Sequence, residues 1–238
     1  MGTKMDDPRV TFKRLAAEEA VKRVESGMLV GLGHGSTALE AVRALARRIE
    51  AEGLSQIVAV PCSRQTEDEA RRLGIPLTNL ADHHELDLTL DGADEVAPNL
   101  DVIKGGGGAL LREKIVAQAS LREIIMVDES KLSPALGTRC PVPVEVLPFA
   151  WKLQARFLEG LGAKVHLRLL ATGAPYETDQ GNLILDCDFG PIEDPRALAA
   201  EMGARAGLIE HGLFLGLVDE VVVAGAAGTR VLTATSQT

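Results

Sequence analysis

Several residues whose chemistry suits proton transfer lie close together in the segment DGADEVAPNLDVIKGGGGALLREKIVA, residues 91–117. Asp91 and Asp94 are three residues apart, and because two nearby carboxylates repel, one of them can hold a proton near neutral pH. Lys104 precedes a run of four glycines, whose bare N–H groups can stabilise an oxyanion beside the ammonium. Glu113 follows in the next helical segment, where its carboxylate can act as a general base.

Each acid in this segment also has a structural interpretation. Either aspartate alone is more typical of a turn or a helix cap than of catalysis. Glu113 is flanked by Arg112 and Lys114 and, taken alone, is more typical of a solvated charge on a helix face than of a catalytic base. The glycine run is harder to explain structurally, because consecutive glycines lose much backbone entropy on folding. The residue types alone therefore leave the roles of the acids open.

The segment GLGHGSTA, residues 31–38, is predicted to be a turn between a strand and a helix. It lacks the Gly-Lys-Ser/Thr ending of nucleotide-hydrolysing phosphate loops, and Ser36 stands where the dinucleotide fingerprint has its third glycine. Small residues before a helix start offer backbone N–H groups and two hydroxyls, which favours a phosphate or another small anion. The alternative is that Ser36 or Thr37 only caps the helix.

Basic residues elsewhere add candidate anion contacts. Lys131 follows an apolar run in VDESKL, and Lys13 and Arg14 lie in the first predicted helix. Each is also typical of a surface charge. Together, the acid pair, the glycine amides, the anion turn and the lysines favour proton abstraction beside a carbonyl on a small phosphorylated substrate.

Apolar runs that alternate with amphipathic segments predict an α/β fold with a doubly wound, Rossmann-like parallel sheet. Strands are expected at 28–32, 57–63, 86–94 and 123–130, and helices at 11–26, 38–52, 66–74 and 109–120. Ligands of such sheets bind at the carboxyl ends of the strands. GHGST, DGAD and DESK each lie at the end of an expected strand, so we expect the candidate residues at that edge.

A second, smaller α+β domain of the ferredoxin-like type is predicted for residues 137–209. The alternation of expected strands and helices stops in the proline-rich segment 134–148. Two strand–helix–strand patterns follow, and Asp194 and Pro195 open the helix of the second. Two strands within 213–233 are expected to rejoin the first sheet. The predicted division is a Rossmann-like catalytic domain of residues 1–136 plus 210–238 and a small domain of residues 137–209.

The composition of the 238-residue chain is that of a globular protein, with 46% hydrophobic and 25% charged residues. A net charge of −9 argues against nucleic acid or an anionic membrane as the main partner. The start MGTKMDDPRV lacks the apolar segment of a signal peptide, and no apolar run reaches the length of a membrane span, so a cytoplasmic location is expected. Cys62, Cys140 and Cys187 are expected to be reduced thiols, and neither a metal nor a cofactor is expected.

Five motifs in register resemble ribose-5-phosphate isomerase of the A type: GLGHGSTA, DGADEV, KGGGGALLREKIVA, VDESKL and PVEVLPFA. The likeness continues through GNLILDCDFGPIEDP and HGLFLGLVDEVVV, so it covers nearly the whole chain. The resemblance implies interconversion of ribose 5-phosphate and ribulose 5-phosphate in the non-oxidative pentose phosphate pathway, through an enediolate and without a metal. It also implies a homodimer, or a homotetramer built as a dimer of dimers.

The resemblance also implies roles for individual residues. Glu113 is implied to be the general base that moves a proton between C1 and C2, while Asp91 and Asp94 assist ring opening and handle the hydroxyl protons. Lys104 is implied to act beside the glycine loop. The implied substrate-binding residues are His34, Gly35, Ser36, Thr37, Asp91, Gly92, Ala93, Asp94, Lys104, Gly105, Gly106, Gly107, Lys131 and Lys13.

Two positions depart from the usual pattern of that family. His34 stands where the family usually has threonine, so an imidazole that titrates near neutral pH replaces a small hydroxyl. Gly108 stands where alanine is common. Backbone anion binding by residues 34–37 is expected to survive the first change, and the second is expected to cost little.

Two alternative functions are retained at this stage. A sugar-phosphate-sensing module of a transcription regulator would need a DNA-binding helix-turn-helix, for which the residues before the first expected strand are too few. An acyl- or CoA-transferring enzyme of similar architecture would use a glutamate as a nucleophile and would form a covalent glutamyl adduct.

Overall fold

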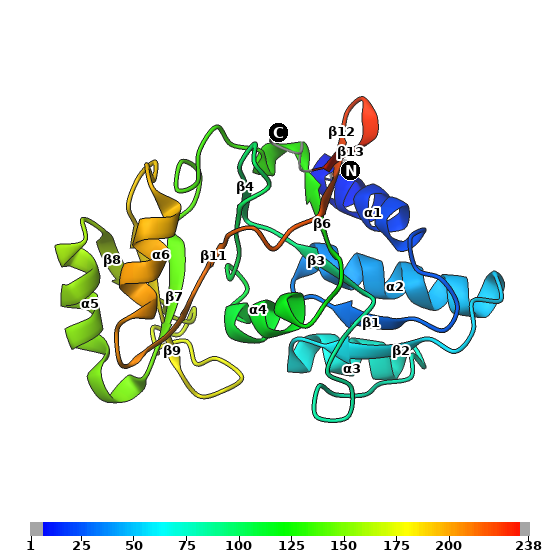
Figure 1. Ribbon diagram of the computed structural model, residues 1–238, viewed down its shortest axis with the longest axis horizontal. Coiled ribbons are helices and arrows are strands. Elements are labelled where there is room, and N and C mark those ends of the chain that lie inside the picture. The colour runs from blue at the N-terminus through cyan, green and yellow to red at the C-terminus, as the bar shows by residue number, and fades with distance from the viewer. Residues whose placement is uncertain (1–6, 234–238) are drawn as a thin grey trace, which may run out of the picture. The chain divides into compact units, whose positions relative to one another are not determined.

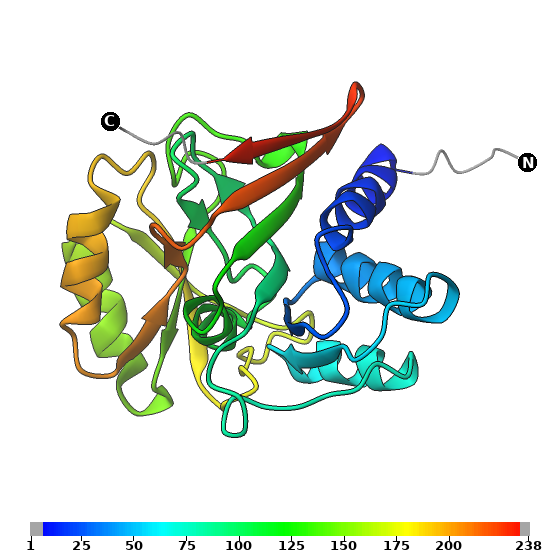
Figure 2. The same ribbon diagram turned by 45° about the vertical axis from the view of Figure 1, so that its right-hand side comes forward.

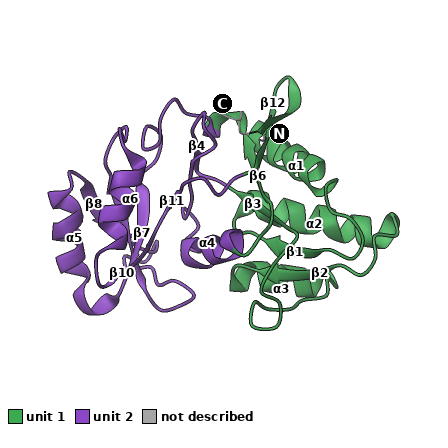
Figure 3. Ribbon diagram, viewed as in Figure 1, with its two compact units in different colours: residues 1–92, 119–130, 219–238 green, residues 93–118, 131–218 purple. Residues whose placement is uncertain are grey.

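The computed structural model describes residues 7–233 (Figure 1); residues 1–6, part of the opening segment that argued against a signal peptide, lie outside this range. Two compact units make up the chain (Figure 3). Unit 1 comprises Met1–Gly92, Ala119–Ser130 and Asp219–Thr238, and unit 2 comprises Ala93–Gln118 and Lys131–Val218. These bounds differ from the predicted domains, 1–136 plus 210–238 and 137–209, which stay a prediction. In the described part of the chain, no helix is long and apolar enough to cross a membrane.

Unit 1 is built on a sheet whose described strands run in the order β13-β12-β6-β3-β1-β2. All neighbours pair in parallel except β12 and β13, which form an antiparallel hairpin at one edge (Figure 2). The predicted parallel sheet and its two returning strands are therefore confirmed. The bounds are β1 Leu29–Leu32, β2 Val58–Pro61, β3 Leu88–Gly92, β6 Glu123–Asp128, β12 Glu220–Gly225 and β13 Gly228–Thr233.

Helices α1 Pro8–Val21, α2 Ser36–Ala51 and α3 Arg64–Arg72 belong to unit 1. Local sequence sets their ends: Asp7 and Pro8 open α1, the Ser63 hydroxyl caps α3, and Gly74, with φ of 72°, lies just after the end of α3. The buried faces of α1 and α2 pack with the sheet into one apolar core. That core fixes the start of α2 beside the carboxyl end of β1.

The carboxyl ends of β1 and β3 lie where the strand order reverses. The chain leaves β1 for β2 on one side and returns to β3 on the other. Open α/β sheets bind ligands at such a switch point, because the connecting loops diverge there. The GHGST turn follows β1, and Asp91 is the second-last residue of β3. The sequence therefore places these candidate residues at the expected edge.

Unit 2 contains an antiparallel sheet in the order β10-β7-β9-β8. Its elements follow one another as strand–helix–strand, twice, which is the ferredoxin-like pattern predicted from the sequence. Both helices contribute to its apolar core, and α6 opens at Asp194 and Pro195 as predicted. The bounds are β7 Val142–Val146, α5 Trp151–Gly160, β8 Lys164–Leu167, β9 Leu183–Asp188, α6 Pro195–Gly203 and β10 Leu208–His211.

A second small sheet of unit 2, in the order β11-β5-β4, has no counterpart in the sequence predictions. Its strands β4 Glu95–Val96, β5 Val102–Ile103 and β11 Leu213–Phe214 are two residues long, too short for a periodic pattern. Strand β5 leads directly into Lys104, and helix α4, Leu110–Gln118, follows the glycine run. This sheet therefore carries the start of the glycine loop. Short 3-10 turns lie at Glu129–Lys131 and Pro148–Ala150.

Candidate active site

The turn after β1 is held against the end of β3 in unit 1. The Gly33 N–H donates to the Leu90 carbonyl at 2.9 Å, and the His34 N–H donates to Asp91 Oδ1 at 3.0 Å. A Cβ on Gly33 would lie 2.0 Å from Asp91 Cγ, so only glycine fits beside this carboxylate. Asp91 is 1% exposed, and its Oδ1 also accepts the Gly92 N–H at 2.7 Å. Asp91 is thus fixed at the sheet edge by backbone donors.

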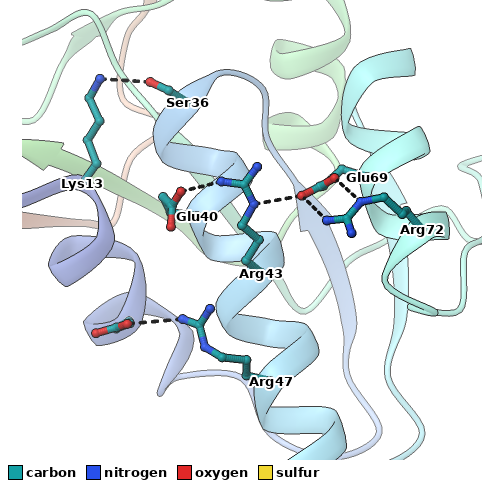
Figure 4. Close-up of polar contacts among 8 residues, drawn as sticks. Lys13, Ser36, Glu40, Arg43, Arg47, Glu69 and Arg72 are labelled. Carbon is teal, nitrogen blue, oxygen red and sulfur yellow. Dashed lines mark hydrogen bonds and ion pairs between the residues drawn. The ribbon is translucent and has the colours of Figure 1, made fainter. Parts of the chain in front are cut away.

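The N-terminus of α2 is arranged to receive an anion. Gly35, with φ of 95°, is its N-cap, and among the described residues no side chain caps this helix, so the interpretation of Ser36 or Thr37 as a cap is wrong. The Lys13 ammonium of α1 donates to Ser36 Oγ at 3.0 Å (Figure 4). A helix start concentrates N–H donors and positive potential, and the ammonium adds to both.

The His34 imidazole braces this turn through two hydroxyls. Thr66 Oγ1 donates to the Gly33 carbonyl at 2.8 Å, and Ser63 Oγ donates to Thr66 Oγ1 at 2.9 Å. Because both hydroxyl protons are then used, His34 Nδ1 is the donor in its 2.9 Å contact with Ser63 Oγ. The His34 side chain thereby ties the turn to the start of α3.

Lys104 and Glu113 form a buried ion pair in unit 2. Nζ lies 3.0 Å from Oε1, and the side chains are 2% and 4% exposed. Glu113 is the fourth residue of α4 and reaches back to Lys104 at the start of the glycine run. Its interpretation as a solvated helix charge is wrong. A carboxylate held beside an ammonium at the glycine run can act as a general base.

Phe214 and Lys114 hold this pair in place. The Phe214 ring centroid lies 5.5 Å from Lys104 Nζ and 4.9 Å from Lys114 Nζ. Lys114 donates to Glu210 Oε1 and to the His211 carbonyl, both at 2.6 Å. Burial lowers the pKa of Lys114, and burial together with the Lys114 charge lowers the pKa of His211 to about 4. His211 is therefore neutral near pH 7. The Lys114 contacts tie α4, which contains Glu113, to β10.

Asp94 contacts the middle of the glycine run. Its Oδ2 accepts the Gly106 N–H at 2.7 Å, and its own N–H donates to the Ile103 carbonyl at 2.8 Å. A Cβ on Gly106 would lie 2.6 Å from Asp94 Oδ1. The next residue, Glu95, is buried and anchors this backbone by accepting the N–H groups of Gly137, Thr138, Arg139 and Cys140.

Two residues that the sequence did not single out hold the carbonyl side of the glycine run. Arg168 donates from one terminal nitrogen to the Gly105 carbonyl at 2.8 Å and to the Gly106 carbonyl at 3.1 Å. The Tyr176 hydroxyl donates to the Gly107 carbonyl at 3.3 Å. Both lie between β8 and β9, far along the chain, so no local spacing could connect them with the loop.

The remaining candidates have less specific surroundings. Ala93 is half-buried, and half-buried Lys131 ends a 3-10 turn. The three cysteines are free thiols, as predicted, and burial raises the pKa of Cys140 and Cys187 above the usual range. Within residues 7–233, no group of three or more His, Cys, Asp or Glu could hold a metal ion.

Comparisons with known proteins identify the family. Residues 58–228 match the family described as Ribose 5-phosphate isomerase A (phosphoriboisomerase A). A relative named Ribose-5-phosphate isomerase A from Chloroflexus aurantiacus is 57% identical over 223 residues, covering 94% of this chain and 93% of the relative. The chain belongs to the ribose 5-phosphate isomerase A family. Enzymes of this family interconvert ribose 5-phosphate and ribulose 5-phosphate in the pentose phosphate pathway.

Other members of the family agree in sequence and structure. The isomerase of Desulfatibacillum aliphaticivorans is 54% identical, covering 94% of this chain and 97% of the relative. A solved ribose 5-phosphate isomerase A from Methanocaldococcus jannaschii is 40% identical, with a TM-score of 0.89 and coverage of 94% and 98%. A D-ribose-5-phosphate isomerase solved in complex with phospho-erythronic acid is 39% identical, with a TM-score of 0.91 and the same coverage. The predicted family and fold class are confirmed.

The candidate residues fall into one group in each unit. Lys13, His34, Gly35, Ser36, Thr37, Asp91 and Gly92 belong to unit 1, and Ala93, Asp94, Lys104, Gly105, Gly106, Gly107, Glu113 and Lys131 belong to unit 2. The contacts within each group are observed, and the catalytic and binding roles of the residues stay predictions.

Proposed function

We propose that this protein interconverts D-ribose 5-phosphate and D-ribulose 5-phosphate by proton transfer through an enediolate. Family membership supports the reaction and the phosphorylated sugar as substrate. The observation that carries the mechanism is the buried Lys104–Glu113 pair, which spans the glycine run. A carboxylate with one cationic partner beside bare amides supplies both a base and oxyanion stabilisation.

Glu113 acts as the base on the open-chain sugar. Its carboxylate takes the proton from C2 of the aldose, the C2–H electrons form the C1–C2 double bond, and negative charge develops on O1. The same carboxyl returns the proton to C1, while a proton passes from O2 to O1. The ketose results without a co-reactant, because every proton and electron pair that leaves one carbon arrives at the other.

The two aspartates and the glycine loop act on the oxygen atoms of the substrate. Lys104 and the N–H groups of Gly105 and Gly107 stabilise the charge on the enediolate oxygens, since fixed donors cost no reorganisation during the reaction. Asp91 and Asp94 exchange hydroxyl protons and assist ring opening. Their support is their position three residues apart in the chain, each held by backbone N–H donors.

The phosphate is bound at the start of α2. Lys13, the Ser36 and Thr37 hydroxyls and the first N–H groups of the helix provide charge and donors suited to a dianion. Lys131 and His34 complete the proposed substrate contacts.

A single assay tests this function. Purified protein is mixed with ribose 5-phosphate and the appearance of ketose is followed, with the same protein and an acyl-CoA thioester in a parallel reaction. We expect ketose formation and no glutamyl adduct by mass spectrometry. Folded protein that forms no ketose, or one that forms the adduct, would contradict the proposal.

A homo-oligomer, either a dimer or a dimer of dimers, is part of the proposal. Unit 2 exposes the apolar side chains of Leu147 and Leu153, and Phe149 is 99% exposed. Exposed apolar patches of this kind typically bind another protein surface. Light scattering on the wild-type protein and on Phe149→Ser should show a smaller particle for the variant; a wild-type monomer would contradict the proposal. A cytoplasmic location is proposed as well, supported by the three free thiols.

A further inference from the structure

The carbonyl groups of the glycine loop are held from one side by unit 2 itself. Arg168 binds the Gly105 and Gly106 carbonyls, and Tyr176 binds the Gly107 carbonyl. A glycine run has the most backbone freedom of any sequence, so it needs external contacts to keep one conformation. These three contacts restrict successive peptide groups of the loop.

Holding a carbonyl also aims an N–H group. In a planar trans peptide, the carbonyl of one residue and the N–H of the next point in opposite directions. The Gly105 carbonyl accepts from Arg168, and the Gly106 N–H of the same peptide group donates to Asp94 Oδ2 at 2.7 Å. By the same geometry, the contact to the Gly106 carbonyl orients the Gly107 N–H. The guanidinium therefore sets the direction of the Gly107 N–H in the proposed oxyanion site and keeps the Gly106 N–H directed at Asp94.

The guanidinium is itself fixed by a carboxylate. Arg168 Nε donates to Asp186 Oδ2 at 3.0 Å, and a terminal nitrogen donates to Asp186 Oδ1. The other terminal nitrogen faces the loop. The planar guanidinium therefore binds Asp186 along one edge and the loop carbonyls along another. A lysine at this position cannot reproduce both sets of contacts, because its ammonium is a single point charge.

Tyr176 lies beside Arg168 and explains Gly108. The Tyr176 N–H donates to the Arg168 carbonyl at 2.9 Å, and the guanidinium carbon lies 5.9 Å from the tyrosine ring centroid. A Cβ on Gly108, where φ is 89°, would lie 2.3 Å from the Tyr176 hydroxyl oxygen. Gly108 thus leaves the space that this hydroxyl occupies.

We propose that Arg168, fixed by Asp186 and assisted by Tyr176, is a positioning residue that aims the Gly107 amide at the reacting oxygens and keeps the Gly106 amide on Asp94. The proposal rests on the proposed function. Because the Gly107 amide would act on charge that develops during the reaction, its misorientation should lower kcat more than it raises KM.

The test compares Arg168→Met with Arg230→Met, a control at an exposed arginine of β13 in unit 1. Initial rates on ribose 5-phosphate give kcat and KM, and competition gives the affinities for phospho-erythronic acid and for inorganic phosphate. The acid carries a carboxylate where the enediolate carries its charge. For Arg168→Met we expect kcat to fall at least about tenfold, with KM changed less than threefold. Affinity for phospho-erythronic acid should fall in parallel, and affinity for inorganic phosphate should not.

Three further variants keep the proposal testable if Arg168→Met does not fold. Asp186→Asn weakens the ion pair that fixes the Arg168 guanidinium, and Tyr176→Phe removes the hydroxyl that binds the Gly107 carbonyl. Arg168→Lys keeps the positive charge but lacks the planar guanidinium. Each should lower kcat by a smaller factor than the methionine variant while circular dichroism stays that of the wild type. Wild-type kcat in all the folded variants, or equal losses for phosphate and phospho-erythronic acid, would overturn the proposal. Inactivity of the wild-type protein itself would instead contradict the proposed function.

Discussion

Replacing Gly106 with alanine should displace the Asp94 carboxylate and lower kcat/KM for ribose 5-phosphate. The added Cβ would lie 2.6 Å from Asp94 Oδ1 and 2.9 Å from its Cγ. Ordinary contact begins near 3.4 Å, so the carboxylate has to retreat by about 0.8 Å. The backbone at Gly106 does not have a positive φ, so alanine itself fits there and the effect comes from Asp94. A displacement of this size costs roughly ten- to a hundredfold in rate when the displaced group acts on the substrate.

The assay is the initial rate of ketose formation, and the chain offers matched controls. Gly160→Ala and Gly203→Ala make the same substitution at helix ends where an added Cβ meets nothing within 4 Å. Both controls should keep wild-type kcat/KM, with a melting temperature equal to or slightly above that of the wild type, because alanine favours the helix. If Gly106→Ala folds and turns over as fast as these controls, the proposed role of Asp94 is refuted.

Three further predictions test other parts of the molecule. Lys13→Met should raise KM for ribose 5-phosphate about tenfold, because the phosphate loses one charge-assisted hydrogen bond. The control variant Lys164→Met should leave KM unchanged. Equal KM values for the two variants would contradict a role for Lys13 in the phosphate site. Burial, with Glu210 and Asp179 nearby, raises the pKa of Glu145, whose Oε1 accepts from Thr178 and Asn182. As pH rises, the folded state keeps this proton longer than the unfolded chain does. The free energy of unfolding of the wild type should therefore fall relative to that of Glu145→Gln above about pH 4.5, by at most ~1.4 kcal/mol per pH unit. Urea unfolding measures this difference, and parallel curves of stability against pH for the two proteins would contradict the prediction. Exhaustive chelation should leave turnover unchanged, and activity restored only by added metal would argue against proton transfer by Glu113.

Much of the fold was predictable because its signals are local. Apolar runs bounded by turns predicted β1, β3 and β6, and the Asp194–Pro195 pair predicted the start of α6. The candidate site was predicted from signals that are just as local, since DGAD ends an apolar run and KGGGG precedes the helix that contains Glu113. The two-residue strands β4, β5 and β11 carry no periodic signal and depend on pairing between distant segments.

Residues that act across the sequence were missed. Arg168 in KVHLRLL is typical of a strand residue, and only the folded unit brings it to the Gly105 and Gly106 carbonyls. Burial was also beyond local reasoning: the charges that flank Glu113 suggest a solvated helix face, whereas the structure encloses it with Lys104. The side-chain contacts of His34 likewise depend on Ser63, from a different strand–helix connection.

The most direct test of the central claim, that Glu113 carries the carbon-bound proton, is the kcat of Glu113→Gln on ribose 5-phosphate. Glutamine keeps an oxygen that can accept from Lys104, so the variant removes the base with little change of shape, and Glu50→Gln serves as the exposed control. In D2O, the wild type should place deuterium on C1 of ribulose 5-phosphate. We predict that Glu113→Gln lowers kcat by at least about 100-fold and that its product forms correspondingly slowly. Near-normal turnover by folded Glu113→Gln would contradict the claim.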